Sequence, residues 1–296
     1  MKRKANDNMN KYENQTYDQE RALYGIKNSI VENCIFDGPA DGESALKETA
    51  NLSIKDCKFM LRYPMWHLTK AEIEGCTLTE TCRAALWYDS DISISNCTLN
   101  GIKAIRECSK TSLKSCRIDS TEFGWFCQGL EINDCVINSE YAFLKSTDIE
   151  IENIELSGKY SFQYTQNVTI HNSVLITKDA FWHSKNVTVT DSVVKGEYLG
   201  WYSENLKFIR CKIIGTQPLC YAKGLVLEDC EMEGADLAFE NSEVTANITG
   251  NIISIKNPQS GSIVCDKVEL VIQDEYQRPP ANCKIITRSK IEHLAL

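Results

Sequence analysis

The sequence predicts an all-β fold: a right-handed, single-stranded parallel β-helix, a solenoid with about 19 residues in each coil. Three observations predict it. A small residue, most often Cys, recurs every 19 residues; apolar residues stand at fixed distances on both sides of it; and Asn, Asp or Gly recurs at two bends in each unit. Short strands and bends fill each unit, which leaves no room for the helix of leucine-rich or helical repeats.

The recurring small residue, called the anchor here, sets the register of the repeat. Apart from intervals of 23 and 21 near the start, successive anchors are 19 residues apart. The residues three before and two after every anchor are apolar. The anchors are Cys34, Cys57, Cys76, Cys97, Cys116, Cys135, Ile154, Ser173, Ser192, Cys211 and Cys230.

Strands and bends follow from the residues around each anchor. Apolar residues alternate with polar ones, as in Leu130-Glu131-Ile132, and many are β-branched, a pattern typical of half-buried strands. The residue before the anchor and the residue six before it are mostly Asn, Asp or Gly, which tolerate left-handed backbone conformations. Each coil is therefore expected to read strand, bend, strand, bend.

Composition and charge restrict the expected cellular compartment, cofactors and binding partners. The 14 cysteines are interpreted as reduced, buried residues of a cytoplasmic protein, because no apolar segment follows the basic start at Lys2 to Lys4. No CxxC pair occurs, which argues against a zinc site, and no metal or other cofactor is expected. The net charge of −9 argues against nucleic acid and an anionic membrane as partners. The oligomeric state is left open.

The repeat also divides the chain. Residues 1–16 are polar and expected to be disordered, residues 17–275 to form the β-helix domain, and residues 276–296 to form a C-terminal cap or arm. Pro279 and Pro280 stand where the stack of coils should end.

Several units resemble a known group of proteins. The segments Gly129–Ile137 (GLEINDCVI) and Asn205–Ile213 (NLKFIRCKI) are similar to the repeats of the pectin-lyase-like superfamily. With the opening segment Tyr17–Tyr24 (YDQERALY), the chain resembles an uncharacterised bacterial family of that fold over roughly residues 20–275. The resemblance implies the fold and leaves the activity open, because this scaffold hosts unrelated reactions and purely structural roles.

A second column of residues, ten before the anchor, carries every tryptophan of the chain. Lys47 and Arg106 share this column, and an unpaired charge is costly to bury, which favours an outward orientation. The alternative is that the Trp side chains fill the core. An outward column, with the aromatic residues that follow it, would form an aromatic band able to contact sugar rings. The predicted ligand-binding residues are Trp66, Trp87, Arg106, Trp125, Trp182, Trp201, Tyr88 and Tyr202.

Catalytic residues are harder to find. A glycosidase needs two carboxylates about 5 to 9.5 Å apart, and Asp89, Asp91 and Glu107 are the candidates, with Arg106 beside them to pair an anionic ligand group. Arg106 could instead do no more than stack on its tryptophan neighbours. His67 and His183 are six coils apart and cannot share a site.

Two functions therefore remain. The first is binding or modification of an oligo- or polysaccharide through the aromatic band. The second is a non-enzymatic scaffold or protein-interaction module. Whether the protein is an enzyme stays open.

Overall fold

The computed structural model describes residues 9–38 and 43–288, and the chain divides into two compact units, residues 1–149 (unit 1) and 150–296 (unit 2). Each unit is a parallel β-solenoid, and no helix occurs in these described ranges. The predicted fold class and the coil length of about 19 residues are confirmed. No helix of the described part is long and apolar enough to cross a membrane.

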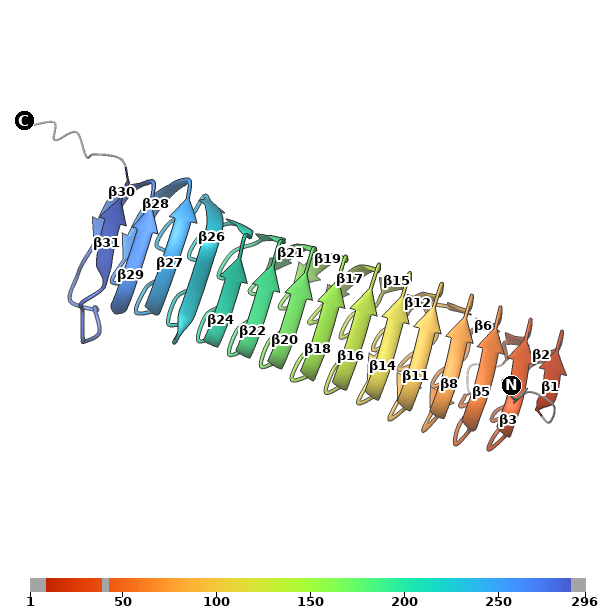
Figure 1. The fold of residues 1–296 in the computed structure, drawn as a ribbon. Helices are drawn as coiled ribbons and strands as arrows, with labels where there is room; N and C mark the ends of the chain where they lie inside the picture. Colours follow the sequence, from red (N-terminus) through yellow and green to blue (C-terminus); the bar gives the residue numbers. More distant parts are fainter. Residues whose placement is uncertain (1–8, 39–42, 289–296) are drawn as a thin grey trace, which may run out of the picture. The chain divides into compact units, whose positions relative to one another are not determined.

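Unit 1 stacks its strands in three ladders, of which Figure 1 shows the main one most clearly. The main ladder consists of β1 (Asn10–Glu13), β3 (Lys27–Glu32), β5 (Ala50–Lys55), β8 (Thr69–Glu74), β11 (Ser90–Ser95), β14 (Ser109–Lys114) and β16 (Gln128–Asn133). The second consists of β2 (Thr16–Tyr17), β4 (Ile35–Phe36), β6 (Lys58–Phe59), β9 (Thr77–Leu78), β12 (Thr98–Asn100), β15 (Arg117–Asp119) and β17 (Val136–Glu140). The third consists of β7 (Met65–Trp66), β10 (Leu86–Trp87) and β13 (Ile105–Arg106).

Unit 2 repeats the first two of these ladders. Its main ladder consists of β20 (Gln166–His171), β22 (Lys185–Thr190), β24 (Glu204–Ile209), β26 (Leu225–Glu233), β27 (Glu243–Thr249), β29 (Ser260–Cys265) and β31 (Lys284–Thr287). The second contains β19 (Glu155–Lys159), β21 (Val174–Lys178), β23 (Val193–Lys195) and β25 (Lys212–Ile214), while β28 (Asn251–Lys256) and β30 (Lys267–Ile272) form a separate pair. The strand β18 (Thr147–Glu152) contains the division between the units.

The register is the one that the sequence predicts. Ile94 of β11 lies beside Leu113 of β14, which lies beside Ile132 of β16, and each is at most 2% exposed. In unit 2, Phe208 pairs in the same way with Leu227. Each apolar column of the sequence is thus a ladder of buried side chains along the core.

The predicted bends have left-handed backbone conformations. Asn96 and Asp134, directly before anchors, have φ of 53° and 55°, and Asp91 and Asn186, six residues before anchors, have 61° and 53°. Asn and Asp adopt this region more readily than other side-chain-bearing residues. The chain therefore turns at the same two places in successive coils, most often at Asn or Asp.

The anchor side chain satisfies the backbone at the first bend. The Cys57 amide donates to Cys76 Sγ at 3.4 Å, and Cys76 Sγ donates to the Glu74 carbonyl at 3.3 Å. Ser192 Oγ makes the equivalent pair of hydrogen bonds in unit 2, with Ser173 and Thr190. Thiol and hydroxyl are interchangeable at this position because each both accepts and donates a hydrogen bond.

The two ends differ from the prediction. Disorder of residues 1–16 is wrong for the part that is described, because β1 pairs with β3 and β2 pairs with β4; residues 1–8 lie outside the described ranges. At the other end, β31 pairs with β29, so strand pairing continues beyond the expected boundary at residue 275.

Candidate functional site

The tryptophan column faces outward in both units. In the preceding column Met65, Leu86 and Ile105 are buried, whereas Trp66 and Trp87 are half-buried. The residues that follow the column adopt left-handed conformations, with φ between 52° and 59° from Glu48 through His67, Tyr88, Glu107, Phe126, Lys145, Tyr164 and His183 to Tyr202 and Tyr221. A bend at this position lets two successive side chains point outward, which is why strict alternation fails here.

In unit 1 the column is a continuous stack. The Trp66 and Trp87 rings lie 5.4 Å apart and nearly parallel, at 11°. Lys47 Nζ lies 3.9 Å from the Trp66 ring centre on one side of this pair. On the other side Arg106 Cζ lies 5.9 Å from Trp87 and 5.6 Å from Trp125. Arg106 therefore lies between two indoles and within the ~6 Å of each ring centre that a cation–π contact requires.

Unit 2 carries a second stack of the same kind. Trp182 and Trp201 lie 5.5 Å apart at 4°. Tyr164, His183, Tyr202 and Tyr221 form a parallel series with centroid distances of 4.8, 5.0 and 4.9 Å. The Trp182 indole N–H donates to the Tyr198 carbonyl at 2.7 Å, and the Trp201 indole N–H donates to the Gln217 carbonyl at 2.7 Å.

These stacks limit what the aromatic band can do. A sugar ring binds on the open face of an aromatic ring, but the faces of Trp66 and Trp87 are covered by Lys47, by each other and by Arg106. Trp182 and Trp201 cover one face of each other. The band presents ring edges and hydroxyl groups to solvent, and its stacking joins neighbouring coils.

Arg106 is paired with the carboxylate next to it. Arg106 Nε donates to Glu107 Oε1 at 2.9 Å. Partial burial raises the pKa of Glu107, but hydrogen bonds from Tyr88 and Arg106 outweigh it and leave that pKa below its usual value. The Glu107 carboxylate in turn raises the pKa of Tyr88. Glu107 is therefore an ionised partner of Arg106 rather than a proton donor.

The three predicted carboxylates do not converge. Asp89 points into the core and is 1% exposed, Asp91 is exposed on the main ladder, and Glu107 belongs to the aromatic band. The three side chains thus lie in three different surroundings: the core, the main ladder and the aromatic band. Asp89 Oδ1 accepts the Leu68 amide at 2.8 Å, Oδ2 has no partner among the described residues, and burial raises the Asp89 pKa well above its usual value.

A groove crosses the outward face of the main ladder of unit 1. It has a volume of about 830 Å³, and the sequence reasoning missed it, because its residues lie far apart along the chain. Its lining is polar apart from a few aliphatic side chains: Met9, Ile30, Glu32, Asn51, Leu52, Ser53, Lys55, Lys70, Ala71, Glu72, Asp91, Ile92, Ser93, Lys110, Thr111, Ser112, Gly129 and Glu131. Asp91, a predicted site residue, lies in this groove.

Hydroxyls and charges alternate across the groove. Ser93 of β11 lies between Glu72 of β8 and Ser112 of β14. Lys70 and Lys110 flank the rung of Asp91, and neither lysine forms an ion pair within the described residues. The groove thus offers donors and acceptors side by side without a dominant charge. No group of three potential metal ligands occurs in the described ranges.

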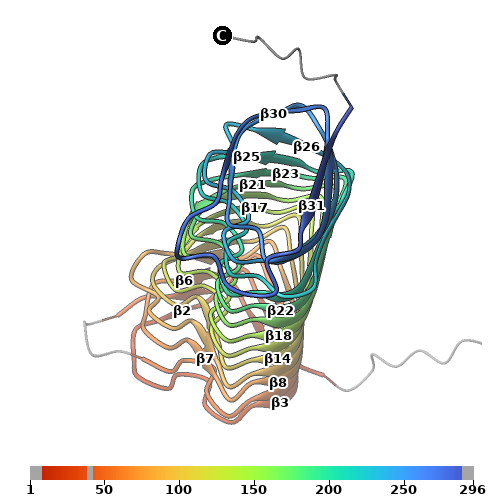
Figure 2. The ribbon, with the colours of Figure 1, turned by 90° about the vertical axis from the view of Figure 1, so that its left-hand side faces the viewer.

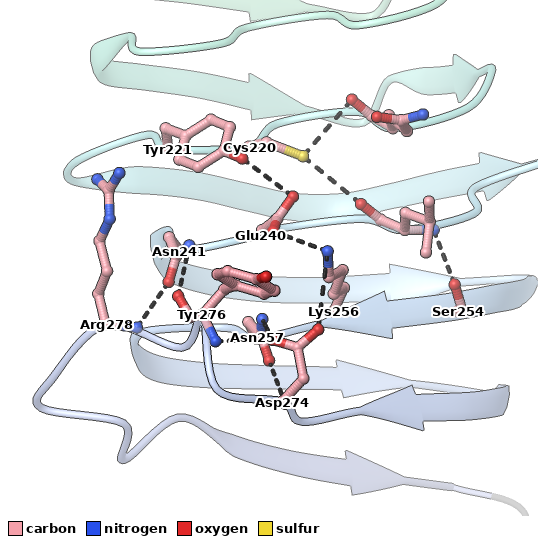
Figure 3. A network of polar contacts seen from close by, with 12 residues as sticks. Cys220, Tyr221, Glu240, Asn241, Ser254, Lys256, Asn257, Asp274, Tyr276 and Arg278 are labelled. Atoms are coloured by element: carbon pink, nitrogen blue, oxygen red, sulfur yellow. Dashed lines mark hydrogen bonds and ion pairs between the residues drawn. The ribbon is translucent and has the colours of Figure 1, made fainter.

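A polar network ties the last loop to unit 2 (Figure 3). Lys256 Nζ lies 3.0 Å from Glu240 and 3.9 Å from Asp274. Fully buried Asn257 donates to Asp274 Oδ1 at 2.6 Å and accepts the Asp274 amide at 3.0 Å. Burial, with a further contribution from Glu240, raises the pKa of Tyr221 to about 12. Lys256, Glu240 and Asp274 thus neutralise one another, which indicates a structural role for this network.

Comparison with protein families gives one match. A family described as "Protein of unknown function (DUF3737)" matches residues 10–286, nearly the whole chain. The chain belongs to this family. No curated protein matches it.

Solved structures with similar folds are distant from this family member. The tailspike protein of E. coli bacteriophage HK620, solved with a pentasaccharide, has 11% identity and a TM-score of 0.40; the match covers 88% of this chain and 60% of the tailspike. The mannuronan C-5 epimerase AlgE4 A-module of Azotobacter vinelandii has 9% identity, a TM-score of 0.34, and coverage of 94% and 89%. The catalytic domain of a GH87 alpha-1,3-glucanase has 10% identity and a TM-score of 0.32, and the match covers 95% of this chain and 63% of the glucanase domain. These similarities are too low to transfer an activity to this chain.

Proposed function

We propose that the protein binds an extended oligo- or polysaccharide in the groove of unit 1. The observation that supports this is a hollow of about 830 Å³ lined on neighbouring rungs by hydroxyls, ammonium groups and carboxylates. Sugar hydroxyls both donate and accept hydrogen bonds, so a site for them needs donors and acceptors in close alternation. Ser93 and Ser112 supply both, Lys70 and Lys110 supply donors, and Glu72 supplies acceptors.

The dimensions favour a linear ligand over a compact one. The groove runs over six neighbouring strands, from β3 to β16. At about 4.8 Å per rung the five intervals span roughly 24 Å. Pockets for compact small molecules fall in the same volume range but enclose most of the ligand. A shallow hollow of this length suits a chain of several sugar rings lying across the strands.

The proposal concerns binding, and the aromatic band suggests a second candidate function. Tyr88, Tyr164 and Tyr202 are 43%, 51% and 40% exposed, and Arg106 lies among the rings of unit 1. Aromatic residues and Arg dominate the energetics of protein interfaces. A protein-interaction module that uses ring edges is therefore the alternative, and Trp66, Trp87, Trp125, Trp182 and Trp201 would belong to that surface.

Binding to a glycan panel, followed by isothermal titration of the strongest ligand, tests the first candidate. Ser93→Trp should fill the centre of the groove and weaken binding by more than about tenfold, equivalent to ~1.4 kcal/mol. Thr169→Trp is the matched control, because Thr169 is an exposed residue at the equivalent outward position of β20 in unit 2. No binding to any glycan, or equal losses in the two variants, would contradict the proposal.

Mutation of the aromatic band separates the two candidates. Tyr88→Ala with Tyr202→Ala should leave glycan affinity unchanged if the groove is the site. A loss of glycan binding in this double variant, with the Ser93→Trp protein unaffected, would move the site to the aromatic band.

A further inference from the structure

The last coil of unit 2 exposes aliphatic side chains at positions that are buried one coil earlier. Ile252 and Ile255 of β28 are fully buried. Their partners in β30 are more accessible: Val268 is half-buried and Val271 is 40% exposed. Leu270 of β30 is 55% exposed. These side chains are accessible because no described strand lies over β30.

The neighbouring strand β31 is uncovered in the same way. Ile285 is half-buried although its partner Ile263 in β29 is fully buried, and Ile286 is 51% exposed. Among the described strands, none pairs with the outer edges of β30 and β31, which form the end of unit 2 (Figure 2). An open strand edge beside apolar side chains is a template for pairing with another chain.

The first coil of unit 1 has a different chemistry. Tyr12 and Tyr17 are half-buried there, Asn10 and Glu13 are exposed, and Tyr17 stacks on Phe36 at 5.0 Å. Amphipathic side chains of this kind finish a solenoid, because they cover the core and keep a polar tip in water. The first coil is therefore a poor match for the aliphatic last coil, and a head-to-tail contact would in addition form open fibres.

We infer that the last coil of unit 2 docks against the same coil of a second copy of this chain. A two-fold contact uses the same patch on both copies and closes after two subunits. Antiparallel pairing of the two β30 strands permits a register in which Lys267 lies opposite Glu269 of the second copy, twice, with Val268 opposite Val268. Opposite charges on facing strands stabilise such a pair. Residues 267–269 of β30 are thus self-complementary in charge.

Mass in solution tests the contact. By light scattering after size exclusion, the full chain should have twice its mass of 33.5 kDa, and dilution should dissociate it. Leu270→Asp should shift the protein to the single-chain mass while the circular dichroism spectrum stays unchanged, because in this register residue 270 lies opposite Asp266 of the second copy and like charges repel. Ile176→Asp is the matched control, because Ile176 of β21 is 51% exposed against 55% for Leu270, and this variant should remain dimeric.

Charge exchange and cross-linking test the register. Lys267→Glu should weaken the dimer, and adding Glu269→Lys should restore it. In a Cys283→Ser background, which removes the one thiol that is not fully buried among the described residues, Val268→Cys should form an intermolecular disulfide under mild oxidation. Thr169→Cys in the same background should not.

Three results would overturn the inference. They are a single-chain mass at every concentration, a dimer that survives Leu270→Asp, and a monomer that becomes a dimer only when the chain is ended at Arg288. The last result would assign the cover of this coil to residues 289–296 instead of a second copy.

Discussion

Replacing Asp89 by Ser should change how stability depends on pH. Asp89 lies in an interior column whose other members include Ser184 and Ser203, whose hydroxyls donate to backbone carbonyls at 2.8 and 2.7 Å. Asp89 accepts the Leu68 amide in the same column, and its second oxygen has no partner among the described residues. A carboxyl group can fill this position only as the neutral acid, because an ionised one would be buried and unpaired.

The magnitude follows from proton linkage. Burial raises the folded-state pKa of Asp89, so between the unfolded pKa of about 3.9 and the folded pKa the unfolded chain has lost a proton that the folded chain keeps. In this window the free energy of unfolding falls as pH rises, by ~1.4 kcal/mol for each pH unit. Below about 3.9 the contribution is complete, and above the folded pKa no further loss occurs.

Urea unfolding at a series of pH values above about 3.9 measures this. The difference in unfolding free energy between Asp89→Ser and wild type should grow with pH, since other titrating groups cancel in that difference. Ser184→Ala is the control, because it changes the same interior column without a titratable group and should give a difference independent of pH. A constant difference for Asp89→Ser, or one that shrinks as pH rises, would refute a neutral buried acid.

Three further predictions concern the core and the thiols. Cys76→Ala should lower the unfolding free energy by about 1 to 3 kcal/mol, because it leaves the buried Cys57 amide without a hydrogen-bond acceptor. Cys76→Ser should lower it less, because the hydroxyl can replace the thiol. Equal urea midpoints for the two variants would contradict this hydrogen bond. Ile132→Asp should lower the unfolding free energy by more than about 4 kcal/mol, because Ile132 is fully buried in the main ladder. A variant that melts at the wild-type temperature would show that the register is wrong. Alkylation followed by mass spectrometry should label half-buried Cys283 first in the native protein. Cys82 is buried, which raises its pKa to about 12, and should react slowly. Rapid native labelling of Cys82 would contradict that burial.

The fold was accessible from sequence because a solenoid is nearly one-dimensional. Each residue of a column meets its equivalents in the coils on either side, so the spacing of Cys97, Cys116 and Cys135 already gives the strand partners. The bends were accessible for a similar reason, since Asn and Asp recur where the backbone is left-handed.

The site was less accessible, because side-chain direction depends on where the bends fall. A left-handed residue directly after the tryptophan column turns two successive side chains outward, which alternation alone does not predict. Asp89 lies one residue beyond that bend and points inward, away from Glu107. Its environment could have been inferred from its column mates Cys108 and Ser184, which are small and polar. The groove emerges only when outward residues of six strands are placed side by side.

The most direct test of glycan binding in the groove is lysine footprinting with and without the strongest ligand of the panel, read by mass spectrometry. The account predicts that bound glycan slows modification of Lys70 and Lys110, which line the groove, and leaves Lys185 of β22 unchanged. Bound glycan that protects Lys47 and not Lys70 or Lys110 would place the ligand on the aromatic band and contradict the assignment.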